Sequence, residues 1–374
     1  MNFALSQDQI EAREWARAFA KEVIAPSAFL HSREKIKPSL LEEISKKGFM
    51  TLLVPETLGG LALDAVSFAL VMKEISKACG SVGVTVAVTN MIADVLVREG
   101  SSFQHQKYLA DLVSGRSLTA SFCLTENSAG SDAKALKTSA KKNISGYQIS
   151  GEKIFVTNGA FSGFFLVMAR TSDEAVSAFL VERGAPGLQL GKEEDKMGLT
   201  GSSTIRLSLE NVQVKPEQLV GKEGDGFKIA MRALDGGRIS VSAQALGIAE
   251  AALEAGIRYA KERQAFGKSL SDFQAIQWKL ADSATSLSAA ELLMLRAATL
   301  KSEKKDFTQE ASQAKLFSTE AACKVCEEMI QIHGGYGYTK DYPVEKYFRD
   351  VRVTTLYEGT SEIQRLVIAR NLLR

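Results

Sequence analysis

The feature that most limits the fold of this chain is a change of hydrophobic periodicity that occurs twice along it. Apolar residues recur at helical spacing up to about residue 117. From about 118 to 225 the apolar runs are short, strand-like and separated by turn residues, as in a sandwich or small barrel. Long helical segments return from about 226. We predict an α+β fold with an N-terminal helical domain (1–117), a middle β-sandwich or barrel-like domain (118–225) and a C-terminal helical bundle domain (226–374).

Three helix boundaries can be predicted within the helical parts. Pro26 should end the first helix, because proline cannot donate to the helical ladder. The apolar stretch from 64 to 100 should consist of buried helices broken near Gly80 and Gly83. Ser361 and Gln364 have the spacing of a capping box, which predicts the start of the last helix.

Charge and cysteine usage exclude several classes of function. The net charge of +2, with both signs mixed along the chain, gives no footprint for nucleic acid. We find no apolar run long enough to span a bilayer and no signal peptide, so we expect a cytoplasmic or mitochondrial matrix-like location. Cys323 and Cys326 form an isolated C-x-x-C in a helical pattern, and the three histidines are far apart in sequence. We therefore expect no metal site.

Two motifs in the β-rich part have residue types suited to a ligand. "CLTENSAGSD" carries Thr125, Gly130 and Ser131, whose hydroxyls and open backbone could approach a flat or anionic ligand. "KIFVTNGAFSG" joins the β-like Phe155–Thr157 to an Asn-Gly turn signal. An ordinary hairpin loop explains either motif equally well when it is taken alone.

Three further motifs lie in the C-terminal part. "LDGGRIS" places Asp235 three residues before Arg238, which suits a local ion pair at a glycine-rich helix entry. "ERQAFGKSLSDFQ" offers Arg263 as a fork for phosphate or carboxylate, although a solvated interhelical turn fits as well. "IHGGYGY" is a helix stop or a pyrophosphate-cradling turn, and it lacks the strand–turn–helix context of a Rossmann fingerprint.

The last motif, "YEGTSEIQ", places the carboxylate of Glu358 beside Gly359 at a helix start. The positive end of the helix would lower the pKa of Glu358, and burial in a ligand pocket would raise it. A catalytic base would suit that position, and so would an ordinary acidic residue at a helix start.

In this order and at these intervals, the motifs resemble those of the acyl-CoA dehydrogenases over essentially all 374 residues. The combination of "LTE…AGSD", "KIFVTNG", "ERQAFGK", "IQIHGGYGY" and "YEGTSEIQRLVIAR" is highly specific, and the chain looks most like the short-chain or butyryl-type members. The resemblance implies a helical domain, a β-domain and a four-helix domain, usually in a homotetramer. It also implies bound FAD, an acyl-CoA substrate and an electron-transfer flavoprotein as electron acceptor.

Site residues can be assigned by matching the family's motifs one by one. The resemblance implies that Glu358 is the catalytic base. The positions that match cofactor contacts are Phe122, Leu124, Thr125, Gly130, Ser131, Phe155, Val156, Thr157, Arg263, Phe266, Gln274, Gln331, Gly334, Gly335, Thr360 and Glu362. Those that match substrate contacts are Ser131, Asp235, Arg238 and Gly359.

Three positions depart from the family's usual pattern. Asn127 replaces a proline after the acid of "TEP", which alters the stiffness of the loop. Phe155 stands where many members have tryptophan over the flavin. Gly237 occupies the helix position at which some branched-chain and long-chain members carry the base. Because glycine has no carboxylate, Gly237 strengthens the assignment of Glu358.

The resemblance implies α,β-dehydrogenation of a thioester, in which Glu358 removes the α-proton and the flavin accepts the β-hydride. The alternatives are an acyl-CoA oxidase-like enzyme, a non-catalytic flavoprotein of the same fold, and a dehydrogenase acting on a carrier-protein thioester. The pocket floor, which sets the length and branching of the acyl group, is expected on the N-terminal helices around 88–93. The sequence alone does not give the depth of this pocket.

Overall fold

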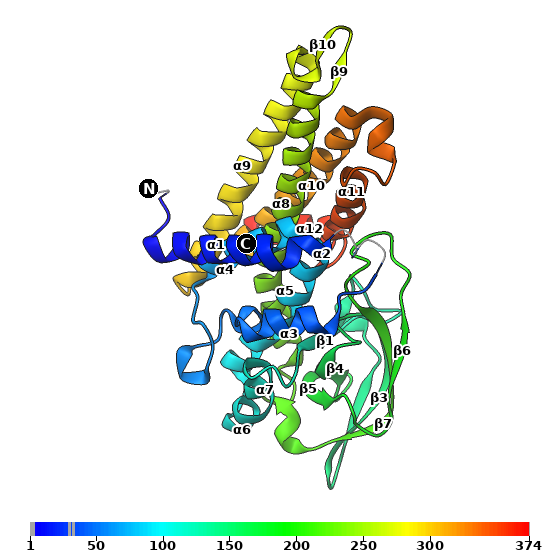
Figure 1. Ribbon diagram of the computed structural model, residues 1–374. Coiled ribbons are helices and arrows are strands. Elements are labelled where there is room, and N and C mark those ends of the chain that lie inside the picture. Colours follow the sequence, from blue (N-terminus) through cyan, green and yellow to red (C-terminus); the bar gives the residue numbers. More distant parts are fainter. Residues whose placement is uncertain (1–3, 29–30, 32–33, 374) are drawn as a thin grey trace.

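The computed structural model describes residues 4–28, 31 and 34–373. Helices at both ends of the chain flank a β-domain, and the long C-terminal helices form a column that projects away from the sheet (Figure 1). The predicted α+β architecture is therefore confirmed.

The N-terminal part is helical because long apolar stretches bury their faces against one another. A π-helical segment, Ala20–Ile24, joins α1 to α2, so the chain passes helically through Pro26. The prediction that Pro26 ends the helix is wrong, because Pro26 lies in the first turn of α2, directly after the π-helical turn, where proline's missing N–H is tolerated. The helices are α1 (Gln7–Phe19), α2 (Ala25–Ala28), α3 (Pro38–Lys46), α4 (Ala65–Ala78), α5 (Gly80–Glu99), α6 (Ser102–Gln104) and α7 (Ala110–Val113).

The break between α4 and α5 falls at Cys79, whose backbone is extended (φ −157°, ψ 111°). The predicted break near Gly80 is thus confirmed, but Gly83 lies inside α5. Gly83 serves close packing instead, since a Cβ at this position would collide with the Ser76 side chain of α4.

Helix α5 contradicts the expectation that no apolar run is long enough to span a bilayer. Its 20 residues are long and apolar enough to cross a membrane by length and composition. However, 83% of its most apolar window is buried inside the protein. The same composition therefore serves here as a core helix, packed against α8 (Gly226–Glu262) and β1 (Thr119–Cys123).

The middle part forms one eight-stranded sheet within the described residues, with the order β6-β7-β3-β2-β4-β5-β8 and β1 paired to β4. Tyr147 and Phe179, from opposite halves of the sheet, share one core, with ring centroids 5.0 Å apart. The sheet thus folds over its own interior, as in a barrel-like domain. The strands are β1 (Thr119–Cys123), β2 (Ser139–Asn143), β3 (Gly146–Thr157), β4 (Ser162–Arg170), β5 (Val176–Glu182), β6 (Leu188–Glu193), β7 (Thr204–Val214) and β8 (Leu219–Val220).

The C-terminal part is built on three long helices. A short hairpin of β9 (Gln264–Ala265) and β10 (Lys268–Ser269) joins the first two at the far end of the column (Figure 1). Gly247 allows α4 to pack closely on α8, because a Cβ there would overlap the Lys73 carbonyl oxygen. The helices are α8 (Gly226–Glu262), α9 (Gln274–Ser302), α10 (Thr308–His333), α11 (Val344–Arg352) and α12 (Ser361–Leu372).

The start of α12 differs from the predicted capping box. Thr360 is the N-cap, and its hydroxyl accepts from the Ile363 N–H at 3.3 Å. Ser361 is already the first helical residue. The Gln364 side chain turns back and donates to the carbonyl oxygens of Glu358 (3.1 Å) and Gly359 (2.8 Å). This contact fixes the turn before the helix instead of capping it.

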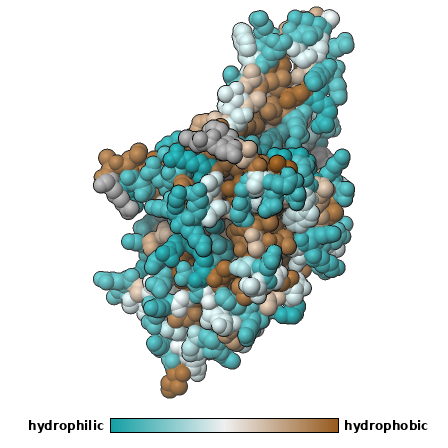
Figure 2. Space-filling view, turned by 90° about the vertical axis from the view of Figure 1, so that its left-hand side faces the viewer, coloured by the Kyte–Doolittle hydropathy of each residue, from teal (hydrophilic) through white to brown (hydrophobic). Residues whose placement is uncertain are grey.

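One face of the helical column is apolar at its surface. Figure 2 shows hydrophobic residues gathered along this column between polar edges. On α9, Trp278 is 62% and Leu292 is 51% exposed. An exposed apolar patch on a helix typically marks a surface that contacts another molecule.

Candidate active site

Glu358 lies in the turn between a 3-10 segment (Val353–Thr355) and α12. Its backbone is left-handed (φ 54°), and so is that of Gly359 (φ 86°). A left-handed conformation is uncommon for a residue with a side chain, and here neighbouring contacts hold it. Besides the contacts of Gln364, the buried Lys315 of α10 donates from Nζ to the Gly359 carbonyl at 2.8 Å.

The Glu358 side chain lies against Gly237 of α8. A Cβ at 237 would be 2.5 Å from Glu358 Oε2 and 3.1 Å from Cδ, with Met91 Sδ of α5 at 3.5 Å. A Cβ at this position would overlap the carboxylate, so glycine at 237 leaves the space that the carboxylate occupies. Residues more than 100 positions apart thus meet at one point, where α5, α8 and the turn before α12 converge.

The carboxylate of Glu358 is isolated. Its Oε2 is shielded from solvent and has no hydrogen-bond partner among the described residues, although the residue as a whole is half-buried. Burial raises the pKa of Glu358 to about 7, against the lowering effect of the Arg238 and Lys315 charges. A carboxyl group with this pKa can both hold and release a proton near neutral pH.

Asp235 and Arg238 are bonded to each other, as their spacing predicts, and not to Glu358. Arg238 Nη1 also contacts Ser312 Oγ at 3.1 Å, and Asp235 Oδ2 accepts from Thr308 Oγ1 at 2.9 Å. Arg238 is 5% exposed, and its Nε has no partner among the described residues. Burial lowers the pKa of Arg238, against the raising effect of Asp235 and Glu358. Arg238 therefore influences the Glu358 carboxylate through its charge, which lowers the pKa of Glu358, and not through a hydrogen bond.

The loop after β1 carries Thr125, Gly130 and Ser131, and a buried ion pair fixes it. Lys153 Nζ of β3 lies 2.7 Å from Glu126 Oε1 and 3.0 Å from the Leu124 carbonyl. Glu126 also accepts from the backbone N–H groups of 137 (2.6 Å) and 138 (2.9 Å). Burial acts to raise the pKa of Glu126, but the Lys153 hydrogen bond and these donors leave it lowered.

Our sequence reasoning missed Glu126 and Lys153, although both lie inside quoted motifs. Neither motif alone signals the pairing, because 27 residues separate the two side chains. The loop itself remains open on one side, since no described heavy atom lies within 4 Å of a Cβ built at Gly130. Phe122 is half-buried and Leu124 is 8% exposed, so both support the loop from behind.

The end of β3 lies beside this loop, because the Ile154 N–H donates to the Thr125 carbonyl at 2.9 Å. Phe155 has φ 55° and a side chain that is 60% exposed. An exposed phenyl ring on a strained backbone next to hydroxyl residues is typical of a surface that receives a flat ligand. Val156 is buried beneath it, and the Thr157 carbonyl accepts from Ser121 Oγ at 2.7 Å.

Most of the remaining predicted cofactor residues lie apart from Glu358 within one chain, around the β9–β10 hairpin, the start of α9 and the end of α10, which is the far end of the column (Figure 1). A hollow of about 500 Å³ brings together Arg263, Gly334 and Gly335, with Tyr259 and His333 stacked beneath at 4.2 Å between centroids. Arg263 lies over the Tyr336 ring, 5.8 Å from its centroid. Phe266 (96% exposed), Gln274 and Gln331 are on the surface nearby. Glu362 and Thr360 stay with the α12 turn.

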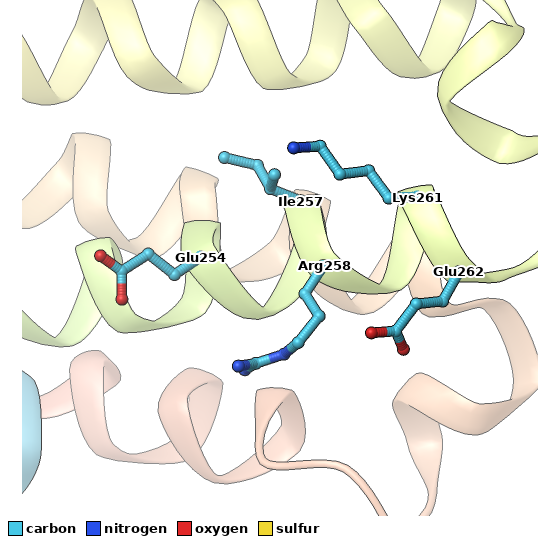
Figure 3. A pocket seen from close by; sticks show the side chains of 5 residues that line it. All are labelled: Glu254, Ile257, Arg258, Lys261 and Glu262. Atoms are coloured by element: carbon cyan, nitrogen blue, oxygen red, sulfur yellow. The ribbon is translucent and has the colours of Figure 1, made fainter.

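A second hollow, of about 340 Å³, contains none of the predicted site residues. Its side chains all come from the last turns of α8, with Ile257 and Lys261 on one side of the helix and Glu254, Arg258 and Glu262 on the other (Figure 3). The mixed charges and the single apolar side chain are typical of a surface groove between helices.

Three family models match the chain in succession. They are the acyl-CoA dehydrogenase N-terminal domain over residues 6–116, the middle domain over 121–212 and the C-terminal domain over 224–373. An acyl-CoA dehydrogenase of Bacillus subtilis is 44% identical over 375 residues, which is 99% of both chains.

Solved structures agree with these matches. Butyryl-CoA dehydrogenase from Megasphaera elsdenii has a TM-score of 0.97 at 40% identity over 100% of each chain. A chain in a study of the electron transferring flavoprotein of Acidaminococcus fermentans, directed at flavin-based electron bifurcation, has a TM-score of 0.98 at 43% identity over 100% of each chain. An acyl-CoA dehydrogenase from Bacillus anthracis complexed with FAD has a TM-score of 0.94 at 34% identity, over 99% of this chain and 67% of that one. The chain belongs to the acyl-CoA dehydrogenase family.

Proposed function

We propose that this acyl-CoA dehydrogenase removes the α- and β-hydrogens of a short-chain acyl-CoA thioester, with Glu358 as the base that abstracts the α-proton. The observation that carries the proposal is the isolated carboxylate over Gly237, with a pKa of about 7 and no competing hydrogen bond at Oε2. A carboxylate engaged in a salt bridge would have neither the free lone pairs nor the basicity for this step. The butyryl-CoA dehydrogenase relative supports the short acyl chain.

The turn that carries Glu358 also offers a hydrogen-bond donor for the thioester. Among the described residues, no acceptor engages the backbone N–H of Glu358. We assign this N–H to the thioester carbonyl oxygen, where negative charge develops as the α-proton leaves. Gly359 keeps side-chain bulk away from the carbonyl, and the two contacts from Lys315 and Gln364 hold the peptide groups in place.

The residues fit a bound FAD. Gly130 leaves open space in the loop that carries Thr125 and Ser131. The hydrogen bond from Ile154 to Thr125 ties this loop to the end of β3, where the Phe155 ring is exposed and Thr157 follows in sequence. FAD supplies the acceptor for the β-hydrogen as hydride, and this chain supplies the walls of the site. Phe122, Leu124 and Val156 support those walls from inside.

We assign the adenosine and pyrophosphate end of FAD to the hollow lined by Arg263, Gly334 and Gly335. Its place at the hairpin end, away from the Glu358 turn of the same chain, is consistent with a site completed by a second subunit. The neighbouring contact residues are Phe266, Gln274 and Gln331, whereas Thr360 and Glu362 would contact the cofactor from the α12 turn. Exposed Trp278 and Leu292 on α9 further support a homo-oligomer, which we propose to be a tetramer.

On the substrate side we place Ser131 and Gly359 next to the thioester. We assign Asp235 and Arg238 no direct contact with the thioester, because the ion pair between them already engages both side chains. We propose an electron-transfer flavoprotein as the electron acceptor, on the support of the similar chain from the Acidaminococcus fermentans study.

The test is anaerobic titration of the FAD-loaded enzyme with butyryl-CoA, followed by the loss of flavin absorbance. We expect bleaching by the wild type and by Glu327→Gln, an exposed glutamate 61% accessible on α10. Glu358→Gln should keep FAD but bleach at least about 10²–10⁴-fold more slowly, which is the usual contribution of positioned proton transfer. Bleaching of Glu358→Gln at the wild-type rate would remove Glu358 from this role.

A further inference from the structure

Lys315 differs from the other buried lysines of the described chain. The other three lie against carboxylates, in the pairs Lys73–Glu250, Lys153–Glu126 and Lys346–Asp350. Lys315 is fully buried, yet its Nζ donates only to the Gly359 carbonyl, and no described carboxylate lies within 4.0 Å of it. Burying an ammonium group without a carboxylate partner costs free energy, so a lysine of this kind calls for a functional explanation.

The hydrogen bond of Lys315 alone does not explain a charge at this position. The Gly359 carbonyl also accepts from Gln364 Nε2 at 2.8 Å, so a neutral donor already satisfies it. A neutral side chain of the same length would leave no unpaired carbonyl behind. The feature to be explained is therefore the positive charge of Lys315.

Glu358 is the carboxylate on which that charge acts most. Burial lowers the pKa of Lys315 to about 8, and the largest opposing effect comes from Glu358. Lys315 is thus still largely cationic at pH 7. In the reverse direction, burial raises the pKa of Glu358, and the charges of Arg238 and then of Lys315 act to lower it.

The other cation that acts on Glu358 is Arg238 of α8, which is held in an ion pair with Asp235. The further ionisable groups on the neighbouring elements are Asp94 of α5 with its partner Lys301 of α9, Glu320 of α10 with its partner Arg365, Glu362 of α12, and Tyr357 in the turn itself. Met91 of α5 is neutral. Lys315 is the cation near the base whose charge no described carboxylate cancels at contact distance.

From this geometry we propose that Lys315 is a positioning residue for proton abstraction: its ammonium, held against the Gly359 carbonyl, favours the ionised form of Glu358, which burial disfavours. This inference rests on the proposed role of Glu358. It gives Lys315 of α10 a role in proton abstraction that requires no contact with the substrate.

The experiment measures the rate of flavin reduction by butyryl-CoA against pH in the FAD-loaded enzyme. Lys315→Met removes the charge and keeps the length of the side chain. The matched control is Lys324→Met, the same substitution on the same helix at a side chain that is 63% exposed. FAD content and the unfolding temperature of each variant are measured first.

We expect the midpoint of the pH–rate profile to rise by about one unit in Lys315→Met, because the loss of a nearby positive charge usually raises a carboxyl pKa by about that much or more. Rates on the acid side should fall about tenfold and rates on the alkaline plateau should stay within about twofold. The two profiles should converge above about pH 8, where Lys315 of the wild type loses its own charge. Lys324→Met should keep the wild-type midpoint.

An unchanged midpoint in a folded, FAD-loaded Lys315→Met would overturn the proposal, whatever the plateau rate. If that variant does not accumulate, Lys315→Gln replaces it, since Gln also lacks the charge but keeps a donor for Gly359, and the same rise in midpoint is expected. Glu358→Gln separates the two levels of inference. If Glu358→Gln still bleaches at the wild-type rate, the proposed function fails; if it is inactive while Lys315→Met keeps the midpoint, only the role of Lys315 fails.

Discussion

Replacing Glu358 by Gln should make the protein more stable at alkaline pH. Burial raises the pKa of Glu358 from 4.5 to about 7, so the folded state holds this proton more tightly than the unfolded state does. Ionisation of Glu358 therefore lowers the free energy of unfolding increasingly as the pH rises from about 4.5 to 7. Above pH 7 this loss of free energy is complete. At 1.36 kcal/mol per pKa unit, it amounts to at most about 3 kcal/mol, an upper value because the residue is only half-buried.

Glutamine has the shape of glutamate but does not ionise, so it should recover this free energy of unfolding. For 374 residues, an unfolding entropy of about 2.1 cal/mol/K per residue converts the gain to about 4 °C in Tm at pH 8. At pH 5 the gain should fall to about 1 kcal/mol or less, which is about 1 °C. Most active-site substitutions that lose activity would otherwise be expected to cost stability.

The assay is thermal unfolding of the FAD-loaded wild type and Glu358→Gln at pH 5 and pH 8, at equal protein concentration. Glu327→Gln is the control, because its exposed carboxylate should change stability by no more than about 0.5 kcal/mol at either pH. A gain at pH 8 that is no larger than the gain at pH 5 would refute the reasoning, and so would a loss of stability at pH 8.

Three further predictions follow from contacts around the site. Gly237→Ala should slow flavin reduction by butyryl-CoA about 100-fold or more, because its methyl group would displace the Glu358 carboxylate. The methyl group of Gly236→Ala would meet the flexible ends of Lys301 at 3.2 Å and Asp94 at 4.0 Å, so that variant should react at nearly the wild-type rate. Lys153→Met should lower the free energy of unfolding by about 3–5 kcal/mol and release FAD on gel filtration, since it leaves a buried carboxylate unpaired; full FAD retention with an unchanged Tm would contradict this. Arg263→Ala should reduce both FAD content and oligomer size in sedimentation, and a fully loaded assembly of wild-type size would exclude its proposed place at the cofactor.

The apolar face of α9 and the isolated charge of Lys315 illustrate two kinds of functional signal. Trp278 and Leu292 could be identified as apolar from the sequence, but their exposure appears only in the folded chain. Lys315 lies in an amphipathic stretch where a lysine is unremarkable by pattern, and only its complete burial distinguishes it. Burial, and not residue type, is therefore the property that marks both.

The sequence by itself determined the order of helical and β-rich parts, the motifs of the family and the spacing that pairs Asp235 with Arg238, because these depend on periodicity and on neighbours a few residues apart. It did not determine that Pro26 lies within a helical segment or that Thr360 caps α12, since backbone geometry decides which of several nearby residues takes each position. Only the tertiary structure placed Glu358 over Gly237 and paired Glu126 with Lys153. The pKa of a carboxylate depends on burial and on charges from distant elements, so the basicity on which the proposed chemistry rests belongs to the packing of the helices, not to any local stretch of the chain.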